Sequence, residues 1–88
     1  MPPYRAVVIT TEFLASFTTL APTDQRRILR ALALLDEDEG HASLRVHQLT
    51  GGLAGKWSAS ASRSLRITFV RLPGGRKQLA DASHHYGD

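Results

Sequence analysis

The spacing of apolar residues predicts a strand and two helices in the first half of the chain. Residues 4–10 (YRAVVIT) are rich in β-branched and aromatic side chains, which indicates a strand. Thr10 or Thr11 can then cap a short helix whose apolar residues recur at helical spacing: Phe13, Leu14, Phe17 and Leu20. We expect Pro22 to close this helix.

A second helix is predicted to start at Thr23 and Asp24. Its apolar stripe repeats every three or four residues: Ile28, Ala31, Leu32 and Leu35. The acidic run 36–39 (DEDE) and Gly40 should end it, and carboxylates at a helix C-terminus oppose the helix dipole. We therefore expect this end to fray and the two helices to form an antiparallel hairpin.

From residue 56 onward the apolar period changes to two. Residues 57–62 alternate Trp57, Ala59 and Ala61 with serines, and residues 65–70 alternate Leu65, Ile67 and Phe69 with polar side chains. This pattern predicts two strands joined by a turn at 63–64. The sequence PGG at 73–75 predicts a second turn before a last strand from about 77 to 85, whereas residues 47–56 (HQLTGGLAGK) predict a glycine-rich loop.

The predicted fold is a single α+β domain over residues 1–88, with the element order β-α-α-β-β-β. A helical hairpin between one strand and a three-stranded meander implies an antiparallel sheet with the helices on one face. Arg66 lies between apolar neighbours and must point to the open face. In the last strand Leu79 and the alanines 80 and 82 compete for the inner face; placing the alanines inward sends Asp81, Ser83 and His85 outward.

Composition narrows the possible chemistry. The 88 residues contain no cysteine, which excludes disulfides, thiolate zinc sites and a cysteine nucleophile. Neither a signal sequence nor an apolar run of roughly 20 residues is present, so we expect a cytoplasmic protein without a membrane span.

Positive charge is concentrated in the second half of the chain. Between residues 45 and 77 there are seven cations and no carboxylate: Arg45, Lys56, Arg63, Arg66, Arg71, Arg76 and Lys77. Such a segment could bind a polyanion or could simply be a solvated basic face, and charge alone leaves both open.

The histidines favour acid–base chemistry over metal binding. His84 and His85 are adjacent and point apart, with no carboxylate at ligand-like spacing, so we expect no metal. RNA can be cleaved without metal when a base takes a 2′-hydroxyl proton, a cation stabilises the phosphate and an acid protonates the leaving oxygen. The residues that could supply these groups are His47, Arg66, His85 and Tyr86, although any one histidine could instead be a surface or structural residue.

The same residues resemble a known family, the RelE/ParE superfamily of bacterial toxins, especially its RelE, YoeB and YafQ messenger-RNA interferases. The resemblance covers essentially the whole chain and rests on residues 47–58 (HQLTGGLAGKWS), 65–69 (LRITF) and 81–86 (DASHHY). It implies a ribosome-dependent, cofactor-free endonuclease that a cognate antitoxin inhibits and that can form a hetero-oligomer with this antitoxin.

The resemblance also implies roles for single residues. Arg66 matches the phosphate-binding arginine, His85 and Tyr86 match the closing His-Tyr of YoeB-like members, and His47 stands where relatives keep a glutamate or histidine base. The expected RNA contacts are Arg45, Lys56, Ser58, Arg63 and Arg76, with Ser58 either contacting phosphate or only covering the sheet. Ser60 and Ser64 stand where YafQ-like members carry a further histidine and aspartate, so that version of the site is incomplete.

Two other functions stay open. A ParE-like gyrase inhibitor would use the same fold without the catalytic residues, and a non-catalytic binding module would retain the fold alone. The set of His47, Arg66, His85 and Tyr86 speaks against the gyrase inhibitor. The expected antitoxin is a short, acidic, partly disordered protein that wraps the domain.

Overall fold

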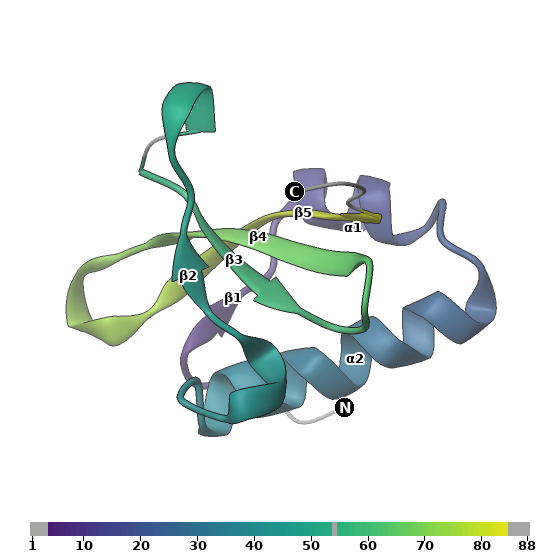
Figure 1. The fold of residues 1–88 in the computed structure, drawn as a ribbon, viewed down its shortest axis with the longest axis horizontal. Coiled ribbons are helices and arrows are strands. Elements are labelled where there is room, and N and C mark those ends of the chain that lie inside the picture. The colour runs from purple at the N-terminus through teal and green to yellow at the C-terminus, as the bar shows by residue number, and fades with distance from the viewer. Residues whose placement is uncertain (1–3, 54, 85–88) are drawn as a thin grey trace.

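A computed structural model describes residues 4–53 and 55–84 and contains five strands and two helices (Figure 1). The strands are β1 (Val7–Val8), β2 (His47–Gln48), β3 (Trp57–Ser60), β4 (Leu65–Arg71) and β5 (Lys77–His84), and the helices are α1 (Thr11–Phe17) and α2 (Pro22–Glu37). Short 3-10 turns occur at Ala42–Leu44, Gly51–Leu53 and Pro73–Gly75. No helix in this described part is long and apolar enough to cross a membrane.

The strands form one sheet in the order β1-β5-β4-β3-β2. In Figure 1, α2 runs along one side of this sheet and α1 lies beside β5. The predicted α+β class and the placement of the helices on one face are confirmed. The expectation of a wholly antiparallel sheet is wrong, because β1 pairs with β5 in parallel. The two helices and the meander between these strands provide the long crossover that a parallel pair requires.

One strand was missed by the sequence pattern. His47 and Gln48 pair antiparallel with Ser58 and Trp57 as β2, at the edge of the sheet. The pattern could not reveal a strand of two exposed residues, because alternation needs a longer run to be visible. The loop that follows turns through Gly51 and Gly55, which have φ of 68° and 92°, values that glycine adopts without steric cost.

The core lies between the helices and the sheet. The predicted stripe of α2 is buried at 0–4% exposure, against Leu65, Ile67 and Phe69 at 0%. Phe13 of α1 is also buried, and Trp57 packs half-buried at the edge of the same cluster. The apolar side chains chosen from their spacing are thus the ones that hold the helices on the sheet.

The helix ends differ slightly from the prediction. Thr10 caps α1 by accepting a hydrogen bond from the N–H of Phe13. However, α1 ends at Phe17, before Leu20, and Pro22 is the first residue of α2 rather than the end of α1. Proline suits the first position of a helix because its missing N–H would have no partner there.

A β-bulge resolves the mixed pattern of the last strand. Thr68 pairs with Asp81 and Phe69 with Leu79, which leaves Ala80 without a partner. The extra residue shifts the alternation, so Leu79 and Ala82 both lie in the core at 1% exposure. The predicted inward place of Ala82 is confirmed, and the expectation that Leu79 would face outward is wrong. Asp81 and Ser83 lie on the open face, as expected.

The acidic run 36–39, at the C-terminal end of α2, forms tertiary contacts with three strands. Asp36 accepts hydrogen bonds from the N–H groups of Ala6 and Val7 at β1. Glu39 bridges β4 and β5, at 2.6 Å from Arg71 and 3.1 Å from the buried Lys77. The guanidinium of Arg71 also lies 4.2 Å above the ring of Trp57. The run therefore fastens the end of α2 to the sheet.

These contacts predict a loss of stability in acid. The hydrogen bond from Arg71, followed by the one from Lys77, lowers the pKa of Glu39 from 4.5 to about 2. A lowered carboxyl pKa means that the stabilisation is complete above pH 4.5 and disappears as the pH falls towards 2. Because the Glu39 side chain is about a third exposed, we expect Glu39→Gln to cost only about 1 kcal/mol at pH 7.

Urea unfolding followed by the single tryptophan at pH 7 and at pH 2 measures this effect. The difference between the wild type and Glu39→Gln should shrink at the lower pH. Glu37→Gln is the matched control, since Glu37 is exposed at the same end of α2. Equal stability of the two variants at pH 7 would contradict the role of Glu39.

Candidate functional site

The open face of the sheet carries two rows of polar side chains that cross the strands. His47 of β2 is paired with Ser58 of β3, which is paired with Thr68 of β4, which is paired with Asp81 of β5. Two residues further along each strand, Ser60, Arg66 and Ser83 form the second row. Because side chains two residues apart share a face, the alternation that buries the apolar residues of β4 also assembles these rows.

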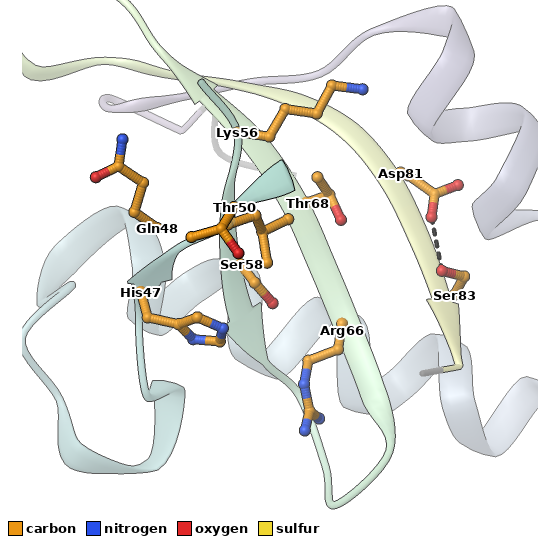
Figure 2. Close-up of a pocket in the computed structure, with 10 residues that line it drawn as sticks. His47, Gln48, Thr50, Lys56, Ser58, Arg66, Thr68, Asp81 and Ser83 are labelled. Atoms are coloured by element: carbon orange, nitrogen blue, oxygen red, sulfur yellow. Dashed lines mark hydrogen bonds between the residues drawn. The ribbon is translucent and has the colours of Figure 1, made fainter. Parts of the chain in front are cut away.

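Except for Ser60, the residues of the two rows line a groove of about 640 Å³. Figure 2 shows His47 and Arg66 reaching into it from β2 and β4, with Asp81 and Ser83 together on β5. Its lining residues come from the open faces of β2 to β5 and from the loop after β2: His47, Gln48, Leu49, Thr50, Lys56, Ser58, Arg66, Thr68, Asp81 and Ser83. An exposed groove of this size with two cations can accommodate a segment of a polyanion.

Hydrogen bonding orients the imidazole of His47. Its Nδ1 lies 2.9 Å from the carbonyl oxygen of Arg45. A carbonyl can only accept, so Nδ1 carries the proton and Nε2 of the neutral ring keeps its lone pair. The exposed ring is therefore in the tautomer that can take up a proton at Nε2.

The backbone of Arg45 explains why its carbonyl meets this ring. Arg45 has φ 48° and ψ 47°, the left-handed conformation, and it is the only non-glycine residue with positive φ in the described ranges. This conformation costs an L-residue roughly 1–2 kcal/mol. Strain of this kind persists where the surrounding structure enforces it, and here it lies two residues from a candidate catalytic side chain.

Arg66 is half-buried on the central strand of the groove. Its Nη1 donates to the carbonyl of Ser62 at 2.9 Å and more weakly to that of Leu65 at 3.4 Å. These bonds hold the guanidinium near the β3–β4 turn and use one of its nitrogens. The other N–H groups of the planar fork can meet phosphate oxygens.

The structure brings together four of the residues predicted from the sequence, His47, Lys56, Ser58 and Arg66. Ser58 is buried at 4% exposure and forms part of the groove floor beside its pairing partner His47. Three other predicted RNA contacts are exposed but do not line the groove: Arg45, Arg63 and Arg76. The remaining cations of the basic segment, Arg71 and Lys77, are paired with Glu39, so this segment does not form one continuous surface.

Of the two adjacent histidines, only His84 lies within the described residues. His84 is paired with Leu65, a core-facing residue, and its ring joins Ser64 at 3.0 Å to Asp24 of α2 at 2.9 Å. The hydrogen bond to His84 is the main cause of the lowered pKa of Asp24. The His84 ring thus contacts α2 on the helix side of the sheet. The predicted catalytic residues His85 and Tyr86 lie outside the described residues.

Several residues of the groove were absent from the predicted site. Gln48 and Thr50 come from the missed strand and its loop, and Thr68 stands two residues after Arg66 on the same face. Asp81 and Ser83 were placed on this face by alternation but were given no role. The alternation of β4 could have identified Thr68; the contribution of β2 required the tertiary pairing. Within the described residues, no three His, Asp or Glu side chains are grouped to hold a metal ion.

Comparisons with known proteins show that the fold is similar to that of toxins from toxin–antitoxin systems. No protein-family model and no curated protein matches the sequence. Among solved structures, the RelBE2 toxin–antitoxin complex from Mycobacterium tuberculosis matches with a TM-score of 0.75 at 20% identity, over 99% of this chain and 97% of that chain.

Two further solved structures have a similar fold. A YoeB/ParE toxin from Agrobacterium tumefaciens matches with a TM-score of 0.72 at 16% identity, over 93% of this chain and 100% of that chain. YafQ from Escherichia coli matches with a TM-score of 0.71 at 15% identity, over 94% and 99% of the two chains. The chain therefore has the fold of the RelE/ParE toxins, as the sequence resemblance implied.

The left-handed backbone of Arg45 predicts an unusual response to substitution. Arg45→Gly should change stability little, because the relief of strain offsets the greater freedom of glycine in the unfolded chain. Arg45→Val should lose about 1–2 kcal/mol, since a β-branched residue tolerates positive φ poorly.

Urea unfolding of both variants gives these differences. The matched control is Arg63, an exposed arginine of the β3–β4 turn whose φ is not positive. A penalty for Arg45→Val no larger than that of Arg63→Val would show that Arg45 is not held in the left-handed conformation.

Proposed function

We propose that this chain is a toxin of the RelE/ParE superfamily that cleaves messenger RNA on the ribosome without a metal ion. The observation that carries the proposal is the position of His47, with Nε2 available as a base, in one groove with Arg66. The fold it shares with YoeB, YafQ and RelBE2 supports the assignment to this class.

The reaction would begin with proton transfer to His47. Nε2 takes the proton of a ribose 2′-hydroxyl, and the resulting oxygen attacks the adjacent phosphorus. A base in this role typically contributes 10²–10⁴-fold to the rate. His47 and Arg66 lie two strands apart and two residues out of register, a backbone separation of about 12 Å, so a phosphate bound between them would meet both side chains.

Arg66 would stabilise the charge that develops on the phosphate. Its guanidinium stays protonated throughout and offers paired N–H donors to the equatorial oxygens. Lys56 at the rim and Ser58 on the floor would add contacts to neighbouring RNA oxygens. The exposed Arg45, Arg63 and Arg76 would contribute to the attraction for ribosomal RNA outside the groove.

The leaving 5′-oxygen needs an acid, and His85 is the candidate. The bond to the 5′-oxygen breaks as this oxygen receives a proton, which leaves a 2′,3′-cyclic phosphate on the upstream fragment. The sequence argument for His85 is the alternation of the last strand predicted over residues 77–85, which sends His85 outward together with Asp81 and Ser83. Tyr86 would help to orient the substrate.

The proposal includes a cognate antitoxin and a cytoplasmic site of action with the ribosome and messenger RNA as partners. The M. tuberculosis structure is a complex of a toxin with its antitoxin. An acidic antitoxin segment would compete with RNA for the cations Lys56 and Arg66.

Translation-coupled cleavage of messenger RNA in a purified system, with a metal-free chain, tests this function. We expect cuts within ribosome-bound codons, and a loss of about 100-fold or more in Arg66→Ala and His47→Ala. Arg30→Ala and His41→Ala are matched controls, because both residues are exposed and neither lines the groove. Both controls should cleave like the wild type.

Absence of cleavage by folded wild-type protein would contradict the proposal. A supercoiling assay on the same protein would then test for gyrase inhibition, the activity expected of a ParE-like chain. Cleavage that persists in both Arg66→Ala and His47→Ala would show that the reaction does not take place in this groove.

A further inference from the structure

Asp81 is the one carboxylate among the groove-lining residues that the structure describes. It stands at the β5 end of the row that begins with His47, next to Thr68. A carboxylate repels phosphate and weakens binding to a polyanion. Its presence in this groove therefore needs an explanation other than attraction to the RNA backbone.

The carboxylate of Asp81 is held in a defined orientation. The hydroxyl of Ser83 donates to Oδ2 at 2.6 Å, as the dashed line in Figure 2 shows. This bond fixes the plane of the carboxylate on the sheet face and uses one acceptor position. A carboxylate offers about four such positions, so both oxygens can still accept from a ligand.

Asp81 does not serve as a partner of the cation beside it. Arg66 and Asp81 are not among the ion pairs of the described residues, and Nη1 of Arg66 turns towards Ser62 and Leu65. Asp81 also lies three strands from His47, a backbone separation of about 14 Å. It is thus too far away to share a proton with the candidate base.

Asp81 is placed to contact the nucleobase of a nucleotide whose phosphate lies at Arg66. The two residues are diagonal neighbours on adjacent strands, with a separation of about 7–8 Å between their Cα atoms. Phosphate would then occupy the cationic side of the groove on β2 to β4, and the attached nucleoside would extend over β5. In single-stranded RNA the Watson–Crick edge of such a base is free to be recognised.

We propose that Asp81, oriented by Ser83, recognises guanine through its Watson–Crick edge and so selects the nucleotide beside the cleaved phosphate. Guanine presents two adjacent donors there, N1–H and the N2 amino group, which match the two oxygens of a carboxylate. Adenine and cytosine present one amino donor next to an acceptor, and uracil presents one N–H between two carbonyls. Only guanine can therefore form the paired contact, which is worth a preference of about 10- to 100-fold.

This inference rests on the proposed function, and Asp81→Asn tests it. An amide offers one donor and one acceptor side by side, so it cannot accept from both N1–H and the N2 amino group of guanine. The variant should therefore lose the preference for guanine, with cleavage beside guanine falling towards the rate beside the other three bases. Ser83→Ala should reduce the preference without reversing it, and the exposed Asp38→Asn at the end of α2 is the control.

Two measurements distinguish a failure of guanine recognition by Asp81 from a failure of the proposed function. The first is translation-coupled cleavage of messages that differ only in the base beside the cut. The second is an NMR titration with short 2′-deoxy oligonucleotides carrying a central G, A, C or U, which bind without being cleaved.

Cleavage of all four messages at equal rates, or an unchanged preference in Asp81→Asn, would overturn the inference and leave the function standing. If the wild type does not cleave at all, the proposed function fails, and the NMR titration alone tests whether Asp81 recognises guanine. Tighter binding of the guanine oligonucleotide that Asp81→Asn abolishes would support base recognition by this groove. Equal binding, or no binding, would overturn it.

Discussion

The alternation of side chains along β4 joins the hydrophobic core to the groove. Leu65, Ile67 and Phe69 are fully buried against the helices, and this burial forces Arg66 and Thr68 to the opposite face. A shift of the strand by one residue would expose three large apolar side chains and place a guanidinium in the core, so the register is strongly specified. Arg66 is held in the groove by the same free energy that stabilises the fold.

Polar contacts at the edges of the sheet complete this arrangement. Asp36 accepts from the N–H groups at β1, which covers an edge that would otherwise be open to another strand. Glu39 neutralises Lys77, whose buried amino group would be costly without a partner. Glu39 is therefore paired with Arg71 and Lys77, which lie outside the groove. The groove cations Lys56 and Arg66 are available to a ligand.

Much of the candidate site could be predicted because it depends on local patterns. Alternation placed Arg66, Asp81 and Ser83 on one face, and the resemblance to RelE/ParE toxins drew attention to His47. The orientation of His47 could not be predicted, because it depends on a left-handed backbone at Arg45 that no spacing rule reveals. The separation of Arg71 and Lys77 from the groove likewise depends on Glu39, 32 residues from Arg71 along the chain.

By itself, the sequence determined the class of fold, the helical stripe, the faces of β4 and the candidate catalytic groups, since these depend on the spacing of neighbouring residues. Only the tertiary structure decided the parallel pairing of β1 with β5, the bulge at Ala80 and the row from His47 to Asp81. These features depend on which strands meet and in what register. That choice is made by the burial of the whole core, to which residues distant in the sequence contribute together.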